Sequence, residues 1–293
     1  MVKYCGLEGD RAKDLEGTRM ESIVILFDEK KEPGQETANE IGRYLADAVR
    51  SVTIVSDVSE IVKKDADIVL VLGGDGTVIQ AAKQVAGKDL PILGINFGTL
   101  GFLTEVERPR LHQALDELLK GNYEIETRMA LTCEIHQQED SRTVGPVINE
   151  FVVCKRDFGH MVTTSVYVDD TYVDTYAADG ILVSTPTGST AYNLSAQGPI
   201  VAPNMEALII TPICPHSLSK KPLIVSSTCT IRLKIDRTKA AYDDDASIRG
   251  DGILLGEATT GDEFIIRKSE DTFKMIHVGE VNFFDKMRVK LGV

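Results

Sequence analysis

An acid stands inside a glycine-rich turn in the first third of the sequence, in GGDGT at Gly73–Thr77. The apolar run before it, Ile68–Leu72, is typical of a strand buried on both faces, and Thr77–Val85 has the spacing of a helix packed on a sheet. A strand, a glycine turn and a helix start bring unpaired N–H groups and a positive dipole end to one place, which favours an anion. Asp75 has the wrong sign for that place.

Two explanations fit this acid. Asp75 caps the helix that follows, a common role for aspartate. Alternatively, it accepts the proton of an alcohol while phosphates lie on the turn, as phosphoryl transfer to a hydroxyl requires. The turn lacks the G-x-G-x-x-G pattern of dinucleotide-binding folds and the G-K-[ST] ending of a Walker loop. The pattern alone leaves both explanations open.

A second feature is VINEFVV, in which Asn149 and Glu150 are adjacent polar residues inside an apolar run. Neighbours on a strand face opposite sides, so a half-buried strand is not expected to hold two polar residues at its centre. The pair therefore marks a strand end or a bulge, or it hydrogen-bonds to ribose hydroxyls in a pocket, because polar groups there need partners.

A third feature is the hydroxyl-rich stretch DGILVSTPTGSTAYNLSAQGP, from Asp179 to Pro199. It combines serines, threonines and glycines with one carboxylate and with Tyr192, a possible stacking face for a base. It lacks the G-x-S-x-G pattern of a hydrolase nucleophile elbow. Backbone amides, hydroxyls and a carboxylate suit the recognition of a purine edge and a sugar.

The elements that must position these residues change character along the chain. Up to about residue 127, apolar runs such as SIVILF and LPILGIN alternate with helical patterns such as GQETANEIGRYLADAV at 34–49. This alternation predicts a parallel sheet with ligands at the carboxyl ends of its strands, where the loops 73–77 and 96–105 both fall. From Met129, alternating runs such as CTIRLKID predict an antiparallel β domain. Residues 281–292 return to a helical pattern, and residues 1–20 are expected to be a loose extension.

The charge and the composition of the chain limit which kinds of partner it can bind. A formal net charge of −13 argues against binding to nucleic acid or an anionic bilayer, so a small-molecule partner is expected. No apolar run approaches the ~20 residues that span a membrane, and the N-terminus lacks an apolar signal core, which predicts a cytoplasmic protein. The five cysteines are scattered without a C-x-x-C pair, which indicates neither a disulfide frame nor a zinc site. Cys214 and His216 leave a nucleophile pair or metal corner as a minor alternative.

Taken in order, these motifs resemble those of the NAD kinase family over about residues 22–290. The resemblance is carried by GGDGT, NFGTLGFLTE, the NE pair, GHM at 159–161, the hydroxyl-rich stretch and TPICPHSLSKKPLIV at 211–225. GGDGT alone is shared with diacylglycerol and sphingosine kinases and, in similar form, with phosphofructokinases. The hydroxyl-rich motif is far more specific.

The resemblance implies an enzyme that transfers a phosphoryl group from ATP, or from polyphosphate, to the 2′-hydroxyl of the adenosine ribose of NAD, with a divalent cation, Mg²⁺. It implies that Asp75 is the proton acceptor and that the donor phosphates lie on Gly73, Gly74, Gly76 and Thr77. It also implies a homodimer or homotetramer. The NAD contacts that it implies are Asp75, Gly76, Phe102, Asn149, Glu150, His160, Asp179, Thr190, Ala191, Tyr192, Asn193, Leu194 and Ser195.

Two positions depart from the family pattern, because Ala177 and Ile253 stand where many members have Arg and Gln. These departures put donor or product contacts in doubt, although they leave Asp75 untouched. A lipid kinase of the diacylglycerol type and a catalytically silent NAD-binding regulator remain as rival functions. The predicted fold is a Rossmann-like parallel α/β domain, residues 1–127 with 272–293 packed back on it, and a β-sandwich-like, NAD-binding domain, residues 128–271.

Overall fold

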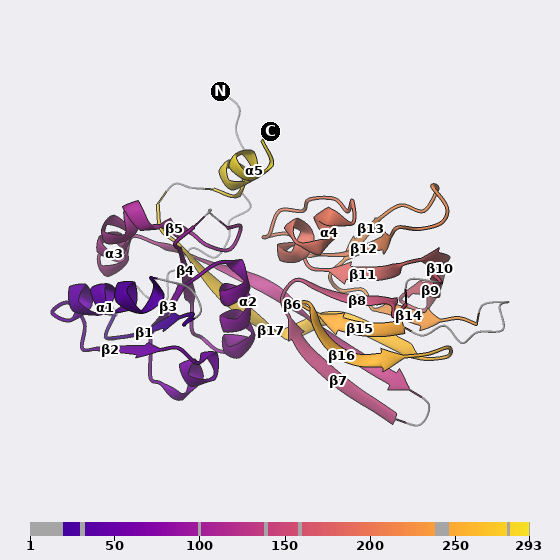
Figure 1. The fold of residues 1–293 in the computed structure, drawn as a ribbon, viewed down its shortest axis with the longest axis horizontal. Helices are drawn as coiled ribbons and strands as arrows, with labels where there is room; N and C mark the ends of the chain where they lie inside the picture. Colours follow the sequence, from indigo (N-terminus) through magenta and orange to yellow (C-terminus); the bar gives the residue numbers. More distant parts are fainter. Residues whose placement is uncertain are drawn as a thin grey trace. The chain divides into compact units, whose positions relative to one another are not determined.

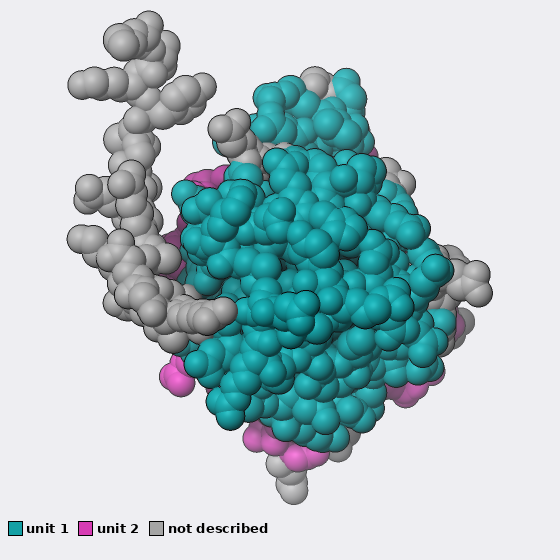
Figure 2. All heavy atoms as spheres, turned by 90° about the vertical axis from the view of Figure 1, so that its left-hand side faces the viewer, with its two compact units in different colours: residues 1–127, 273–293 teal, residues 128–272 magenta. Residues whose placement is uncertain are grey.

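The computed structural model describes residues 20–29, 33–98, 101–137, 140–157, 160–237, 246–279 and 282–292. The extension expected at residues 1–20 lies, apart from Met20, outside the described residues. The chain divides into two compact units (Figure 2). Unit 1 consists of residues 1–127 and 273–293, and unit 2 of residues 128–272.

Unit 1 is built on a parallel sheet with the strand order β2-β1-β3-β4 (Figure 1). The strands are β1 (Ser22–Phe27), β2 (Ser51–Val55), β3 (Ile68–Leu72) and β4 (Ile92–Asn96). Beyond β4, the short β5 (Val106–Glu107) and the end of β17 (Glu263–His277) add parallel pairings. Every residue of β3 and β4 is buried, as expected for strands covered on both faces.

The helices of unit 1 contribute apolar faces to its core. They are α1 (Gly34–Leu45), α2 (Asp75–Val85) and α3 (Leu111–Leu119), with short 3₁₀ turns at Val58–Lys63 and Arg108–Arg110. The predicted helix extends to Val49, but α1 ends at Leu45, whose carbonyl accepts the N–H groups of both Ala48 and Val49, at 2.9 and 3.2 Å. Val49 nevertheless packs against the core, which explains its place in the apolar pattern.

The C-terminal helix α5 (Phe283–Leu291) belongs to unit 1. Asn282 caps it: its side chain accepts the Asp285 N–H at 3.0 Å, and the Asp285 carboxylate accepts the Asn282 N–H in return. Gly292 ends the helix in the left-handed region with φ +67°. Both ends of α5 are therefore specified by local sequence.

Unit 2 contains two packed sheets. One has the order β10-β9-β14-β17, with β6 paired to β17 and β7 paired to β6; the other has the order β13-β12-β11-β8-β15-β16. The bounds are β6 (Glu124–Gln137), β7 (Asp140–Val147), β8 (Glu150–Lys155), β9 (Val162–Val168), β10 (Thr171–Ala178), β11 (Gly180–Ser184), β12 (Ala207–Ile213), β13 (Leu223–Ser226), β14 (Ile231–Ile235), β15 (Ala246–Gly250) and β16 (Ile253–Ala258).

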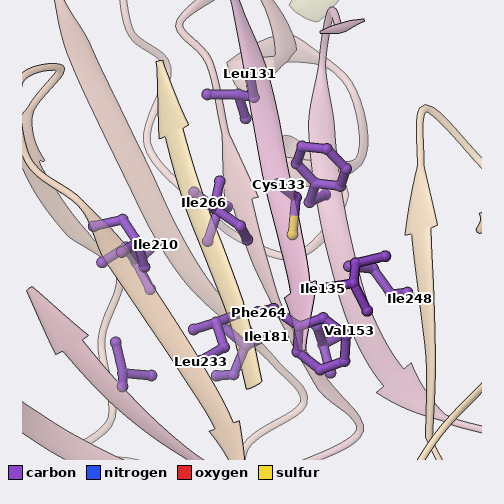
Figure 3. Packing of buried hydrophobic residues seen from close by; sticks show 14 of the residues in the cluster. Leu131, Cys133, Ile135, Val153, Ile181, Ile210, Leu233, Ile248, Phe264 and Ile266 are labelled. Atoms are coloured by element: carbon purple, nitrogen blue, oxygen red, sulfur yellow. The ribbon is translucent and has the colours of Figure 1, made fainter. Parts of the chain in front are cut away.

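Buried apolar side chains from both sheets meet in the middle of unit 2 (Figure 3). Cys133 of β6 and Phe264 of β17 come from the first sheet, while Val153 of β8 and Ile210 of β12 come from the second. The alternation of these residues along each strand is what places them on one inner face. The predicted fold class, a parallel α/β domain with a β-sandwich-like domain, is confirmed. No helix among the described stretches is long and apolar enough to cross a membrane.

Candidate active site

Asp75 occupies the first turn of α2, but it does not cap that helix. The capping residue is Gly74, with φ −96° and ψ −174°, and α2 has no side-chain cap. Of the two explanations for this acid, helix capping is therefore wrong. The carboxylate instead reaches a loop that follows the neighbouring strand β4.

Three successive backbone amides of that loop donate to Asp75. Its Oδ2 accepts the Phe102 N–H at 2.8 Å, and its Oδ1 accepts the N–H groups of Leu103 and Thr104 at 3.0 and 3.3 Å. A carboxylate offers about four lone-pair positions. The three amides therefore leave one acceptor position, on Oδ2.

Gly101 shows how closely this loop, residues 101–104, approaches the acid. A Cβ on Gly101 would lie 1.8 Å from Asp75 Oδ1, so any larger residue would push the carboxylate away. The Gly101 N–H donates to Thr104 Oγ1 at 2.7 Å, which closes the loop on itself. Thr99 and Leu100 of the NFGTLGFLTE motif lie outside the described residues.

The GGDGT turn combines a tight glycine with an open one. A Cβ on Gly73 would lie 2.5 Å from Thr77 Oγ1, whereas a Cβ on Gly76 would meet no atom within 4 Å. The turn is held by the Gly73 N–H donating to Ile95 O at 2.9 Å and by the Thr77 N–H donating to Gly74 O at 2.9 Å. A ligand can therefore approach the backbone closely at Gly76.

Phe102 turns toward the C-terminal helix. Its ring lies 6.3 Å from the Phe283 ring, and the Lys290 Nζ lies 5.0 Å from its centroid. Asp75, the turn at 73–77 and Phe102 are thus brought together in unit 1.

In unit 2, Asn149 and Glu150 mark the start of a strand, since β8 begins at Glu150. The side chain of Asp251 accepts the N–H groups of Ile148 and Asn149 at 3.0 and 2.7 Å. The Asn149 carbonyl accepts the Thr185 N–H at 2.8 Å. The backbone of residues 148 and 149 is therefore held by hydrogen bonds through both its N–H groups and one carbonyl. Asn149 and Glu150 are both buried.

Asp251 is a residue that sequence reasoning missed. It sits in the turn between β15 and β16 with φ 46°, followed by Gly252 with φ 78°. The Asp-Gly pair between two apolar runs is a hairpin signal that would have predicted the turn. No local signal links that turn to Asn149, which lies about a hundred residues earlier, at |i−j| = 102.

The hydroxyl-rich stretch forms a 3₁₀ turn at Thr187–Thr190 and the single-turn helix α4 (Tyr192–Ser195). Asn193 is fully buried: its Nδ2 donates to the carbonyls of Ser189 and Pro199, and its Oδ1 accepts Thr211 Oγ1 at 2.6 Å. This side chain therefore ties α4 to β12, whereas Tyr192 remains 44% exposed.

Around Tyr192 lie several of the predicted site residues. Burial, followed by the charges of Cys154, Cys214, Asp179 and Glu150, raises the pKa of Tyr192 above its ordinary value. Asp179 forms an ion pair with Lys155, whose Nζ lies 2.5 Å from Asp179 Oδ1. Lys155, at the end of β8, is a second residue that the sequence did not single out.

The remaining predicted positions lie in the same unit. Thr190 donates from Oγ1 to the Thr187 carbonyl at 3.3 Å, and Ala191 donates its N–H to Gly188 O at 2.9 Å. Leu194 donates its N–H to Ala191 O at 3.1 Å, while Ser195 is the exposed last residue of α4. His160 is exposed in the bend before β9; its neighbour Gly159 lies outside the described residues.

At Cys214 and His216, the described residues show no arrangement that supports thiol or metal chemistry. The part of the chain that the structure describes contains no group of three or more His, Cys, Asp or Glu side chains arranged to hold a metal ion. Cys133, Cys154, Cys214 and Cys229 are free. The His216 N–H donates to Ala177 O at 2.9 Å, so His216 is tied to β10 through its backbone.

An acid held beside a glycine turn at the carboxyl ends of adjacent parallel strands is the arrangement expected of a phosphotransferase with an alcohol acceptor, and the comparisons show that class. Comparisons give the particular family. Residues 14–123 match the ATP-NAD kinase N-terminal domain, and residues 148–278 match the ATP-NAD kinase C-terminal domain.

Among curated proteins, the chain is 40% identical over 283 residues to an NAD kinase of Caldanaerobacter subterraneus subsp. tengcongensis, covering 96% of this chain and 95% of the relative. It is 42% identical over 228 residues to that of Syntrophotalea carbinolica, covering 77% and 78%. The chain belongs to the NAD kinase family, and it is an NAD kinase in activity.

Two solved structures of related proteins have the same fold as this chain. Yeast NADH kinase, complexed with NADH, matches with a TM-score of 0.83 at 23% identity, over 94% of this chain and 88% of that one. An NAD kinase from Archaeoglobus fulgidus, in complex with ATP, matches with a TM-score of 0.71 at 25% identity, over 93% and 98%.

Proposed function

We propose that this enzyme transfers the terminal phosphoryl group of ATP to the 2′-hydroxyl of the adenosine ribose of NAD, giving NADP and ADP. The observation that carries the proposal is the Asp75 carboxylate, fixed by three loop amides with one acceptor position left on Oδ2. The bound ATP and NADH of the two solved relatives support nucleotides as donor and acceptor. Polyphosphate remains an alternative donor.

In the proposed step, the 2′-oxygen attacks the terminal phosphorus and a new P–O bond forms. The bond from that phosphorus to the bridging oxygen of ATP breaks, and ADP carries away the electron pair. The proton of the 2′-hydroxyl passes to Asp75 Oδ2. A proton acceptor positioned in this way contributes roughly 10²–10⁴-fold to such a step.

The remaining roles are divided between binding groups. We propose that the donor phosphates lie on Gly73, Gly74, Gly76 and Thr77, where the start of α2 favours an anion and Gly76 is open. Asn149 and Glu150 are proposed to hold ribose hydroxyls, and Asp179 to accept a hydrogen bond from an amino group. Gly76, Phe102, His160 and residues 190–195 stay as predicted NAD contacts.

We further propose Mg²⁺ as the cofactor. Mg²⁺ is commonly held by one or two carboxylates together with substrate phosphates, and it keeps several waters. The absence of a three-ligand cluster among the described side chains therefore fits a metal that arrives with the nucleotide. When bound with the donor phosphates, it would neutralise their charge.

Assembly and location are proposals of the same kind. We propose a homodimer or homotetramer, because the two edge strands of one sheet, β13 and β16, expose apolar side chains; they are Leu223, Ile224, Ile253 and Leu254. Light scattering of the purified chain distinguishes these states from a monomer. A cytoplasmic location is supported by the free cysteines Cys133, Cys154, Cys214 and Cys229.

The decisive experiment incubates the purified full chain with NAD, Mg²⁺ and either ATP or polyphosphate. NADP is then measured with an NADP-specific dehydrogenase. We expect NADP from NAD and no phosphorylation of sphingosine or diacylglycerol under the same conditions. If neither donor gave NADP while NAD still bound, the chain would be a silent NAD-binding protein and the proposal would be wrong.

A further inference from the structure

A cluster of charged side chains, two of them buried, lies immediately after the loop that holds Asp75. Glu105 follows Thr104, and its Oε2 accepts a hydrogen bond from Lys286 Nζ of α5 at 2.6 Å. The same oxygen lies 3.2 Å from Nδ1 of His277, at the end of β17. Nε2 of His277 lies 2.7 Å from Glu126 Oε2 of β6. All four residues belong to unit 1.

The cluster is charged, and Glu105 and Lys286 are buried, whereas the His277 and Glu126 side chains are 24% and 21% exposed. The Glu105 and Lys286 side chains are 1% and 4% exposed. Burial alone would lower the pKa of His277, but the hydrogen bonds that its ring donates to Glu105 and Glu126 outweigh it and raise that pKa. Burial alone would raise the pKa of Glu105, but His277 and Lys286 hold it below its ordinary value. An imidazole between two carboxylates donates to both of them only when it is protonated.

Other charged groups near Glu105 come from α3 and the 3₁₀ turn before it. Arg110 and Glu117 line the same small cavity as Glu105, about 40 Å³ in volume. The second oxygen of Glu105, Oε1, is buried and has no hydrogen-bond partner among the described residues. The hydrogen bonds that fix the Glu105 carboxylate therefore fall on Oε2, where Lys286 and His277 meet it.

The cluster and Asp75 both contact residues 102–105, Asp75 through the amides of 102–104 and the cluster through Glu105. Residues 102–104 donate their N–H groups to Asp75, and the next residue, Glu105, donates its N–H to Gly94 O at 2.8 Å. A shift of Glu105 would therefore move the amides that orient the carboxylate. Misplacement of a reacting group by about 1 Å can lower a rate by about 10²-fold.

We propose that Glu105 is a positioning residue for catalysis: through Lys286 and His277, it anchors the loop 101–104 that orients the Asp75 carboxylate. The inference rests on the proposed role of Asp75. It gives a reason for a buried ionic cluster here, because apolar residues of similar volume usually stabilise a fold at least as well as a buried ion pair. Apolar residues in these places would not fix the direction of the Glu105 side chain, whereas hydrogen bonds and ion pairs do.

The test uses the full-length enzyme and four variants, of which Lys286→Arg is the conservative one. Lys286→Met leaves the Glu105 charge unpaired, whereas the double variant Glu105→Gln with Lys286→Met removes both charges and preserves the fold better. Lys274→Met is the matched control, because Lys274 also forms a 2.5 Å ion pair, with Asp89, but at the surface of unit 1. Each protein is assayed for kcat, for KM of NAD and ATP, and for melting temperature.

We expect the double variant to lose about 10- to 100-fold in kcat, with both KM values within about twofold of the parent. Lys274→Met should keep the parental kcat, and Lys286→Arg should recover part of the activity lost in Lys286→Met. Amide hydrogen exchange at Phe102, Leu103 and Thr104 should accelerate in the double variant, because their acceptor is less well positioned.

A double variant that kept the parental kcat and amide exchange would overturn the proposal, even if its melting temperature fell. Failure of the proposed function would look different, since the parent enzyme itself would then produce no NADP. In that case the exchange rates still decide whether the cluster anchors the loop.

Discussion

Replacing Asp75 by asparagine tests its chemical and structural roles together. Both carboxylate oxygens accept loop amides, so an amide side chain cannot reproduce the contacts. The least disruptive orientation keeps the oxygen facing Leu103 and Thr104, and places the NH₂ group opposite the Phe102 N–H. One hydrogen bond to a charged acceptor is then lost.

The expected magnitudes follow from these contacts. A hydrogen bond to a charged group contributes about 1.5–3 kcal/mol, which corresponds to a melting temperature about 3–12 °C lower for a unit of this size. The loss of the proton acceptor should have a larger effect on turnover, and we expect kcat to fall by about 10²–10⁴-fold. We expect the KM for NAD to change much less.

The assay is NADP formation under saturating NAD and ATP, with Thr104→Val as the matched control. Thr104→Val removes the buried acceptor of the Gly101 N–H and loosens the same loop, yet it leaves the Asp75 carboxylate in place. Its kcat should fall by less than about tenfold. If Asp75→Asn lost no more turnover than Thr104→Val, Asp75 would be a loop anchor and the base mechanism would be wrong.

Three further predictions follow from the described geometry. Asp179→Ala should raise the KM for NAD more than it lowers kcat, and an equal or larger loss in kcat would argue against a simple binding role. Excess EDTA should abolish NADP formation, and added Mg²⁺ should restore it; activity that survived EDTA would exclude the divalent cation. The pKa of His277 is raised above its ordinary value of 6.5, so its contribution to stability should be complete below pH 6.5 and should be lost as pH rises through the raised pKa. We therefore expect His277→Gln to flatten the alkaline side of a plot of melting temperature against pH.

The strands of unit 1 could be predicted because their residues carry a local signal. Ile68–Leu72 and Ile92–Asn96 are short, mostly apolar runs, the first followed by Gly73 and the second preceded by Pro91, and both are fully buried parallel strands. Since they pair with each other, the loops that follow them lie at the same edge of the sheet, as expected from the alternation of strands and helices.

The hydroxyl-rich stretch shows where sequence information ends. Its composition predicts ligand contacts, yet several of its polar groups are buried and bonded within the protein: Ser184 and Thr185 donate to the carbonyls of Asn149 and Ile148, and Ser189 to Val201 O. Buried polar groups must find partners. Composition does not reveal which hydroxyls of such a stretch are buried.

The contacts of Asp75 and Glu105 could not be predicted from the sequence for a similar reason. The acid binds amides about 27 positions away, and Glu105 meets Lys286 across 181 positions. Helical and strand periodicities report only on neighbours within one element. Tertiary contacts between a loop, a strand end and a terminal helix leave no such spacing in the sequence.

The position of Asp75 resolves the conflict between its charge and its surroundings. Its carboxylate is satisfied by N–H groups of the loop after β4 and does not cap α2. In the proposed mechanism, the N–H groups of Asp75 and Gly76 at the start of α2 face an incoming phosphate, which the helix dipole favours. The loop amides use three of about four acceptor positions of the carboxylate, so one lone pair is left on Oδ2. In the proposed mechanism, that lone pair accepts the hydroxyl proton, and the second loop is what allows an acid to serve in a turn that also binds phosphate.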